Sequence, residues 1–293
     1  MKLGFIGLGV MGRPMALHLM KRGHDMGVYA RRAESAAPLV AAGARRYATP
    51  AELAANAEVV FTMVTTSSDV EHVALGENGI IHGARSGTVL VDMETISPAV
   101  AKRVAAALAA KGIEMIDAPV SGGPAGATEA SLSIMAGGKA QVFERVKPLF
   151  EALGRTIVHM GDHGAGQTTK ACNQLALLVS AQGTAEALTL ARQSGLDPAK
   201  VREVMLGGIA ASRVLELFGK RMVERDFAAG IESRLYHKDL GIVLELAHGM
   251  GQALPAAAVV MQHINALVGR GGGGSDLSAL IEVVESLGKR NAT

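Results

Sequence analysis

The sequence predicts an α/β domain built on a doubly wound, mostly parallel sheet, followed by an all-α domain. Two patterns support this prediction. Over residues 1–161, short apolar runs rich in β-branched residues alternate with amphipathic helical stretches. After Gly161 the helical patterns continue without another convincing strand, so residues 162–293 are expected to form a second domain. A length of 293 residues is enough for two domains of roughly 100–200 residues each.

Seven strands are expected in the first domain, each short and apolar over most of its length. They are Leu3–Ile6, Gly27–Tyr29, Val59–Val64, Val89–Asp92, Glu114–Asp117, Ser133–Met135 and Ile157–Met160. Such strands are typical of a parallel sheet that is covered on both faces. Helical stretches lie between them, for example Met11–Lys21, Ala99–Lys111 and Gln141–Leu153.

The second domain is expected to begin with a long interdomain helix, from about Gln167 to Gln193, that forms its spine. Later helices are expected to open near Pro198, Ser212, Pro255 and Asp276. The glycine run Gly269–Ser275 is expected to be a flexible surface loop between two helices.

Composition excludes several classes of protein. The 29 Lys and Arg against 27 Asp and Glu give a net charge of +2, and aromatic residues make up 3% of the chain, which argues against nucleic-acid binding. No apolar run approaches the length of a membrane span. One cysteine, Cys172, excludes an intrachain disulfide, and the nine histidines show no zinc-binding spacing, so no metal is expected. A reducing, cytoplasmic location follows.

The segment Gly7-Leu8-Gly9-Val10-Met11-Gly12 fits G-x-G-x-x-G directly after the first strand and before a helix. Gly7 permits a tight turn, Gly9 lets backbone N–H groups approach a pyrophosphate, and Gly12 lets the helix pack on the strand. Unsatisfied N–H groups at the start of the helix favour the phosphates. The sequence therefore predicts a Rossmann-like dinucleotide site.

The second strand is followed by Ala30-Arg31-Arg32, where a cofactor without a 2′-phosphate normally meets an acidic residue. Arginine makes bidentate, charge-assisted bonds to phosphate. NADP is therefore the preferred cofactor, and NAD stays possible. In the alternative interpretation, Arg31 and Arg32 form a solvated helix start and Arg31 only stacks on adenine.

Two segments predict a substrate site. In Asp117–Pro124 a strand ends at Ser121, Gly122 and Gly123, whose hydroxyl and N–H groups are suited to a small carboxylate, although an ordinary turn would look the same. In Gly164–Gln174, Lys170 and Asn173 lie on one helix face.

Near the positive end of that helix, and buried, Lys170 is expected to have a lowered pKa suited to general acid/base work. By itself it would more often be a solvated lysine. Cys172 is expected to be a buried small residue. In His237-Lys238-Asp239-Leu240, a charged helix face is the plain alternative to a functional role.

Taken in order, four segments resemble the β-hydroxyacid dehydrogenase family. They are Gly4–Ala16 (GFIGLGVMGRPMA), Asp117–Gly123 (DAPVSGG), Gly164–Gln174 (GAGQTTKACNQ) and Lys238-Asp239-Leu240. They span nearly the whole chain in the order expected of the family. The resemblance implies an NAD(P)-binding sheet domain, a helical second domain and assembly into homodimers or homotetramers.

The resemblance also implies roles for the matching positions. Lys170 corresponds to the catalytic lysine, Asn173 to a residue that orients the substrate, and Ser121, Gly122 and Gly123 to the carboxylate site. The positions that the family uses to touch the dinucleotide are Gly7, Leu8, Gly9, Val10, Met11, Val64, Thr95 and Lys238.

Four further segments resemble the family members that reduce tartronate semialdehyde to glycerate. They are Gly76–Gly79, Leu132–Met135, Gly207–Ser212 and Arg221–Phe227. The segment Pro124–Ala130 departs from the forms associated with either subgroup, so 3-hydroxyisobutyrate and succinic semialdehyde stay open as substrates. A non-catalytic dinucleotide-binding sensor is the alternative from another class, and such a protein would be expected to lose Lys170.

Overall fold

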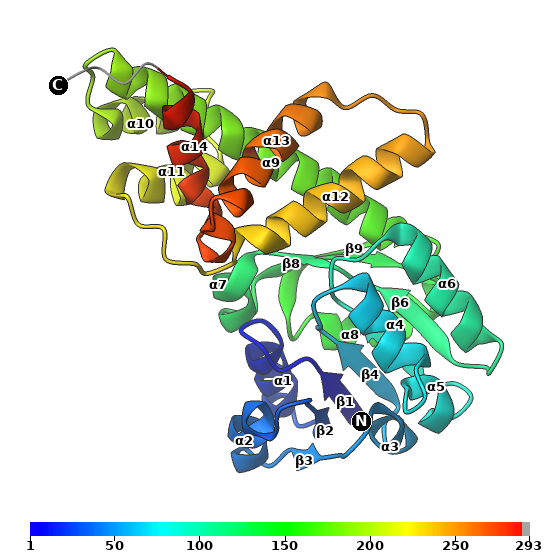
Figure 1. The fold of residues 1–293 in the computed structure, drawn as a ribbon. Helices are drawn as coiled ribbons and strands as arrows, with labels where there is room; N and C mark the ends of the chain where they lie inside the picture. The colour runs from blue at the N-terminus through cyan, green and yellow to red at the C-terminus, as the bar shows by residue number, and fades with distance from the viewer. Residues whose placement is uncertain (289–293) are drawn as a thin grey trace. The chain divides into compact units, whose positions relative to one another are not determined.

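The computed structural model describes residues 1–288; the last five residues of the expected second domain, 289–293, lie outside this range. The chain separates into two compact units, one covering Met1–Lys170 and one beginning at Ala171. The first unit holds the sheet and the second is helical (Figure 1). The predicted fold class is therefore confirmed.

The sheet of the first unit has nine strands in the described chain, in the order β3-β2-β1-β4-β5-β6-β8-β7, with β9 beside β8. The six strands from β3 to β6 are parallel, which gives the doubly wound order. β8 runs antiparallel to β6 and β7 and parallel to β9. The strands are β1 (Lys2–Ile6), β2 (Asp25–Tyr29), β3 (Arg45–Arg46), β4 (Val59–Thr62), β5 (Val89–Asp92), β6 (Glu114–Asp117), β7 (Val120–Ser121), β8 (Leu132–Gly137) and β9 (Gly154–Gly161).

All seven expected strands are present, and the two that the sequence did not predict, β3 and β7, are two residues long each. Such short strands carry too few side chains to show a period of two.

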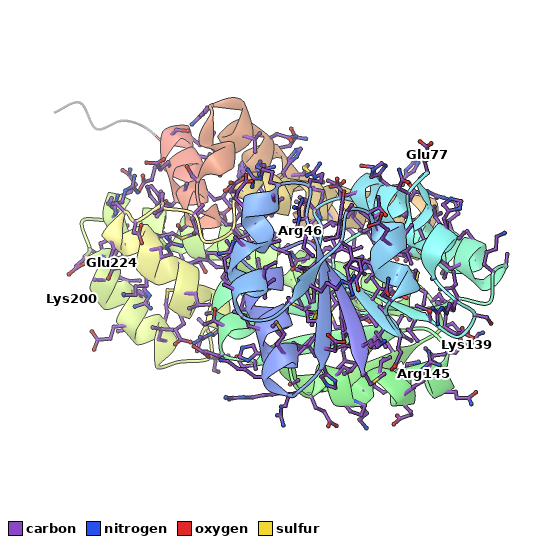
Figure 2. All side chains as sticks on the ribbon, turned by 90° about the horizontal axis from the view of Figure 1, so that it is seen from below. Arg46, Glu77, Lys139, Arg145, Lys200 and Glu224 are labelled. Carbon is purple, nitrogen blue, oxygen red and sulfur yellow. The ribbon has the colours of Figure 1, made fainter. Side chains whose placement is uncertain are left out.

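Helices cover both faces of the sheet (Figure 1). Adjacent residues of β4 show why the strands are apolar throughout, because Val59 and Phe61 pack into one core and Val60 into the other. The first core includes α1 (Gly12–Lys21), α2 (Ala33–Ala41) and α8 (Ala140–Phe150). The second includes α3 (Pro50–Ala55), α4 (Ser67–Leu75), α5 (Ile80–Gly83) and α6 (Pro98–Ala109). Charged side chains such as Lys139 and Arg145 extend from the outside of this unit (Figure 2).

The second unit contains helices and, in the described part after Gly161, no strand. Its core joins the apolar faces of α9, α12 and α13. Asp197 and Ser212 cap two of the helices with their side chains, as the sequence predicts for helix starts. The helices are α9 (Ala165–Gln193, which begins in the first unit), α10 (Pro198–Leu206), α11 (Arg213–Glu224), α12 (Ser233–Gly249), α13 (Pro255–Gly269) and α14 (Leu280–Leu287).

The glycine run after α13 contains a 3₁₀ turn, η1 (Gly272–Gly274). At its end, the carbonyl of Ser275 accepts bonds from both the N–H and the hydroxyl of Ser233, each at 2.8 Å. A second 3₁₀ turn, η2 (Leu277–Ala279), leads into α14. The expected flexible loop is therefore tied to the start of α12.

Within residues 1–288, none of the helices has the length and apolar character that crossing a bilayer requires.

Candidate active site

The carboxyl ends of five parallel strands meet at one edge of the sheet. In register, Ile6 lies beside Tyr29 and Thr62, Thr62 beside Asp92, and Asp92 beside Asp117. Doubly wound sheets bind ligands at this edge. The loops that follow these strands carry most of the positions that the sequence predicts.

The three motif glycines have different environments. Gly7 has φ +96°, and a Cβ atom there would strike the carbonyl of Met63. A Cβ on Gly12 would strike the carbonyl of Gly7 and lie 2.9 Å from the ring of Phe5. At Gly9, no atom of the described chain other than those of Gly9 and its two neighbours in sequence lies within 4 Å of such a Cβ. Gly7 and Gly12 are therefore required by the packing of the chain itself, whereas Gly9 leaves open the space that a bound pyrophosphate would use.

The N-terminus of α1 is suited to an anion. Within the described chain, its first turn has no acidic residue and its N-cap, Met11, makes no side-chain capping bond. The backbone N–H groups and the positive end of the helix dipole are thus not neutralised by a side chain. Of the other loop residues, Leu8 is buried in the core and Val10 is exposed.

Arg31 and Arg32 follow β2 at the same edge, and both are exposed. Among the described residues, the one ion pair that these two arginines make is between Arg32 and Glu34, with 4.0 Å from Arg32 Nε to the carboxylate oxygen and both side chains about four-fifths exposed. An ion pair so exposed contributes little. The guanidinium groups are available to a phosphate.

Val64 and Thr95 lie in the loops after β4 and β5, and both are half-buried. The N–H of Thr95 donates to the side chain of Glu94 at 3.0 Å. Gln167 on α9 ties down the same loop, donating to the carbonyl of Glu94 at 2.7 Å and accepting from the N–H of Ile96 at 3.0 Å. The sequence prediction missed Gln167, because its partners are more than 70 positions away.

Asp117, at the end of β6, caps α9. Its two carboxylate oxygens accept from the N–H groups of Gly164 at 2.7 Å and Gln167 at 3.0 Å. Burial raises the pKa of Asp117, while these N–H bonds lower it and oppose the effect of burial. With this cap α9 begins at Ala165, two residues earlier than predicted, so Lys170 lies in the second turn.

Lys170 is 7% exposed, and its ammonium donates to the carbonyl of Val120 at 2.7 Å. The structure thus brings Lys170 next to the segment containing Ser121, Gly122 and Gly123. The two glycines have φ +134° and +62°, conformations that favour glycine, and they open the short helix α7 (Gly123–Thr128). Ser121 is held by β7, where it pairs with Ser133.

A second carboxylate, Asp92, lies at the end of β5 and is fully buried. Its Oδ1 accepts from the hydroxyl of Thr62 at 2.7 Å, and its Oδ2 has no hydrogen-bond partner among residues 1–288. Burial is the main reason that the pKa of Asp92 rises to about 8, with Glu94 and Asp117 adding repulsion.

In the second unit, Asn173 and Lys238 belong to one polar chain. The amide of Asn173 donates to Gln174 at 2.8 Å, and Gln174 donates to Asp239 at 2.5 Å. Asp239 lies 3.3 Å from the ammonium of Lys238. Cys172, expected to be buried, is exposed, because it is two positions from Lys170 on the helix and points away from the buried face.

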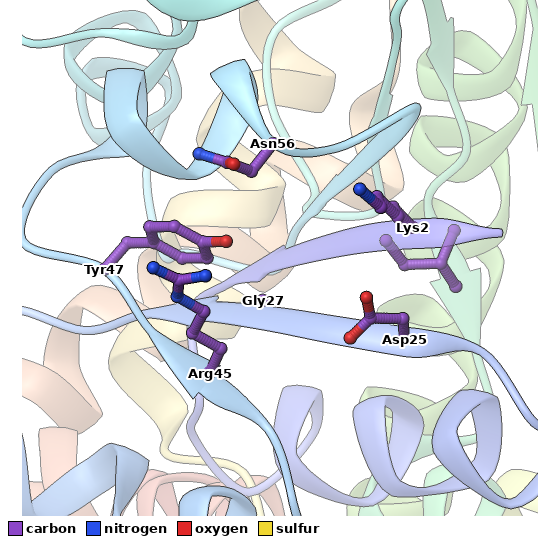
Figure 3. A pocket seen from close by; sticks show the side chains of 7 residues that line it. Lys2, Asp25, Gly27, Arg45, Tyr47 and Asn56 are labelled. Carbon is purple, nitrogen blue, oxygen red and sulfur yellow. The ribbon is translucent and has the colours of Figure 1, made fainter.

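A small cavity of about 90 Å³ lies elsewhere, at the amino ends of β1 and β2 (Figure 3). Figure 3 shows Arg45 beside the ring of Tyr47. The guanidinium carbon of Arg45 lies 5.3 Å from the centroid of that ring. Lys2 and Asp25 open the two strands there. The glycine loop follows the other end of β1, so this cavity is not part of the candidate site.

Comparison with known proteins supports the prediction from the residues. Residues 2–161 match the model of the NAD binding domain of 6-phosphogluconate dehydrogenase, and residues 164–284 match the model of the NAD-binding domain of NADP-dependent 3-hydroxyisobutyrate dehydrogenase. The 2-hydroxy-3-oxopropionate reductase of Escherichia coli (strain K12) is 42% identical over 285 residues, 97% of each chain.

Two further relatives are 3-hydroxyisobutyrate dehydrogenases. That of Pseudomonas aeruginosa is 39% identical over 264 residues, covering 88% of this chain and 89% of its own. The crystal structure of the Salmonella typhimurium protein superposes with a TM-score of 0.88 at 30% identity, covering 96% of this chain and 99% of that one.

The fold, the glycine loop and these matches define an NAD(P)-dependent oxidoreductase that acts on hydroxy acids. The chain belongs to the β-hydroxyacid dehydrogenase family. Its cofactor is a nicotinamide dinucleotide. These relatives are catalysts, which favours an enzyme over the non-catalytic dinucleotide-binding sensor.

Proposed function

We propose that this enzyme reduces tartronate semialdehyde to glycerate, with Lys170 as the general acid/base. The observation that carries the proposal is the buried ammonium of Lys170, which lies 2.7 Å from the carbonyl of Val120, the residue directly before Ser121, Gly122 and Gly123. The proposed acid and the proposed carboxylate-binding segment thus belong to one unit. The 42% identity to the E. coli 2-hydroxy-3-oxopropionate reductase favours this substrate.

Each residue has a role in this reaction. The bound dinucleotide supplies the hydride. Lys170 donates a proton to the aldehyde oxygen as it becomes an alcohol, and the carbonyl of Val120 holds the ammonium in place. The hydroxyl of Ser121 and the N–H groups of Gly122 and Gly123 bind the substrate carboxylate. Asn173 hydrogen-bonds to the substrate and orients it.

The dinucleotide is held by the backbone of the glycine loop and by the side chains that follow the neighbouring strands. We propose NADP as the preferred form, because Arg31 and Arg32 are exposed at the end of β2 and Ala30 supplies no carboxylate for a ribose hydroxyl. The positions assigned to the dinucleotide are Gly7, Leu8, Gly9, Val10, Met11, Gly12, Arg31, Arg32, Val64, Thr95 and Lys238.

The lysine assignment is tested by Lys170→Ala. A positioned acid/base contributes ~10²–10⁴-fold, so kcat is expected to fall at least a hundredfold while the dinucleotide still binds. Lys200→Ala, which removes an exposed lysine on α10 (Figure 2), is the control and is expected to leave kcat unchanged. If kcat of Lys170→Ala stays within a few-fold of the wild-type value, Lys170 is not the general acid.

The 39% identity to the P. aeruginosa enzyme keeps 3-hydroxyisobutyrate as the second candidate substrate. Tartronate, methylmalonate and succinic semialdehydes, each tested with NADPH and NADH, distinguish the candidates by kcat/KM. The highest value is expected for tartronate semialdehyde with NADPH. A higher value for either other aldehyde reassigns the substrate.

We further propose that residues 1–161 form the dinucleotide-binding domain and residues 162–293 form the substrate and oligomerisation domain of a cytoplasmic homodimer or homotetramer. The boundary is supported by the two family models, which end at residue 161 and begin at residue 164. Light scattering on the purified protein tests the assembly, and a mass of 30.2 kDa, that of one chain, contradicts it.

A further inference from the structure

The polar chain of the second unit has a defined direction. Gln174 and Asp239, its central members, are 3% and 8% exposed. Asn173 Nδ2 donates to Gln174 Oε1, and Gln174 Nε2 donates to Asp239 Oδ2. The other oxygen of Asp239 faces the ammonium of Lys238 at 3.3 Å.

Chemistry requires this direction. A carboxylate is only an acceptor, so Gln174 must present its nitrogen to Asp239. The amide oxygen of Gln174 then faces Asn173, so Asn173 must donate a hydrogen bond to it from its own Nδ2. Turning either amide over would place two acceptors or two donors together in a buried setting, and that leaves polar groups unsatisfied. The oxygen of Asn173 is therefore directed away from Gln174.

We propose that Gln174 and Asp239 are positioning residues that fix Asn173 as a hydrogen-bond acceptor for a hydroxyl group of the substrate. The inference rests on the proposed function, which assigns Asn173 to the substrate, and it makes that role specific. An acceptor pairs with a hydroxyl and not with an aldehyde oxygen. The site thus selects a small 3-oxo acid that carries a hydroxyl group over the analogue that carries a methyl group in its place.

The first test is Gln174→Met, which keeps the size of the side chain and removes both hydrogen-bonding groups. Releasing Asn173 is expected to lower kcat/KM for tartronate semialdehyde about tenfold or more, and that for methylmalonate semialdehyde less than threefold. Only the first aldehyde has a hydroxyl for Asn173 to bind. Equal losses for the two aldehydes, or no loss, overturn the inference.

The second test is Gln174→Glu. When protonated, Glu at this position donates to Asp239 and accepts from Asn173, as Gln does. When ionised, it repels Asp239. The other titratable groups near positions 174 and 239 are Lys238 and Tyr236 on α12, and Lys170 one turn earlier on α9.

The activity of Gln174→Glu relative to wild type is expected to rise at least fivefold from pH 8 to pH 5.5, because two neighbouring carboxyl groups share a proton at low pH. The ratio for Gln174→Met is expected to stay flat over the same range. Loss of bulk or general destabilisation would not produce such a rescue. A flat ratio for Gln174→Glu contradicts the inference.

A third measurement does not depend on turnover. In wild type, the side-chain NH₂ protons of Asn173 and Gln174, assigned by their loss in variants, are expected to exchange slowly with solvent in NMR spectra. Asp239→Leu is expected to speed both exchanges at least fivefold. Unchanged exchange means that the hydrogen bonds from Asn173 to Gln174 and from Gln174 to Asp239 do not form. If exchange changes as expected while Lys170→Ala keeps full activity, the proposed function is wrong but the hydrogen-bonded polar chain is present.

Discussion

Asp92 gives the sharpest prediction about stability. This carboxyl is fully buried at the end of β5, with the hydroxyl of Thr62 as its side-chain donor and its Oδ2 without a partner in the described chain. Burial raises its pKa from 3.8 to about 8. Between these two pH values the native protein holds a proton that the unfolded chain has released. Stability must therefore fall as the pH rises through this window and level off above about pH 8.

The size of the effect follows from the pKa. Each pH unit within the window costs ~1.36 kcal/mol, because the unfolded chain binds almost one proton fewer than the native one. From pH 5 to pH 8 the free energy of unfolding is therefore expected to fall by about 3–4 kcal/mol through Asp92 alone. That is a large share of the ~5–15 kcal/mol that stabilises an ordinary protein.

The assay compares wild type with Asp92→Asn. Asparagine keeps an acceptor for Thr62 and cannot ionise, so this contribution disappears. The variant pays a constant cost for its buried NH₂ group, and for that reason the slopes with pH are compared and not the absolute values. Urea unfolding at pH 5, 6, 7 and 8 is expected to show wild type losing about 3–4 kcal/mol more than the variant over this range. Asp25→Asn, an exposed aspartate of β2, is expected to follow wild type.

Two results would refute the reasoning. Parallel pH profiles for wild type and Asp92→Asn would show that this carboxyl titrates in the native state as it does in the unfolded chain. A steeper loss in the variant would mean that Asp92 stabilises the protein as an anion. Carboxyl ¹³C shifts of Asp92, followed from pH 5 to pH 9, give the pKa directly and separate the two cases.

Three further predictions concern the site. Gly12→Ala is expected to lower the free energy of unfolding in urea by about 1–3 kcal/mol, because the new Cβ meets the backbone. Gly9→Ala is expected to leave this free energy nearly unchanged and to weaken dinucleotide binding, measured by calorimetry, at least tenfold. Replacing Arg31 and Arg32 together by Ala is expected to lower the preference for NADPH over NADH about tenfold or more, measured as the ratio of the two kcat/KM values. Asp117→Ala leaves two buried N–H groups unpaired, so it is expected to lower the free energy of unfolding by about 1–3 kcal/mol and to speed amide exchange at the start of α9. Unchanged exchange there would contradict the capping role of Asp117.

The sequence was informative where one short segment contains the whole physical requirement. The glycine loop is such a case, because a strand, three glycines and a helix within 20 residues specify a turn, an open face and a close contact. The buried strands are another, since a strand covered on both faces is apolar at every position, as Val59, Val60 and Phe61 are.

Contacts between distant segments could not be predicted in this way. The carboxylate of Asp117 caps a helix that begins 48 positions later, and in sequence it looks like the end of a strand before a Pro turn. Gln174 and Asp239 are 65 positions apart. Each directly follows a residue to which the family resemblance gives a role, Asn173 and Lys238 respectively. The wrong prediction for Cys172 has a related cause, because residue size was used where the direction of the helix face decides burial.

The two carboxyl groups at neighbouring strand ends show why such contacts matter for function. Asp92 and Asp117 are register partners in β5 and β6, and burial opposes ionisation of both. Only Asp117 receives two N–H bonds from the start of α9, and such bonds favour a charged carboxylate. Asp92, near neutral pH, is mostly protonated, so this edge of the sheet carries less negative charge than its sequence suggests. Because a dinucleotide brings its phosphates to the same edge, a neutral Asp92 removes a repulsion that an ionised one would add.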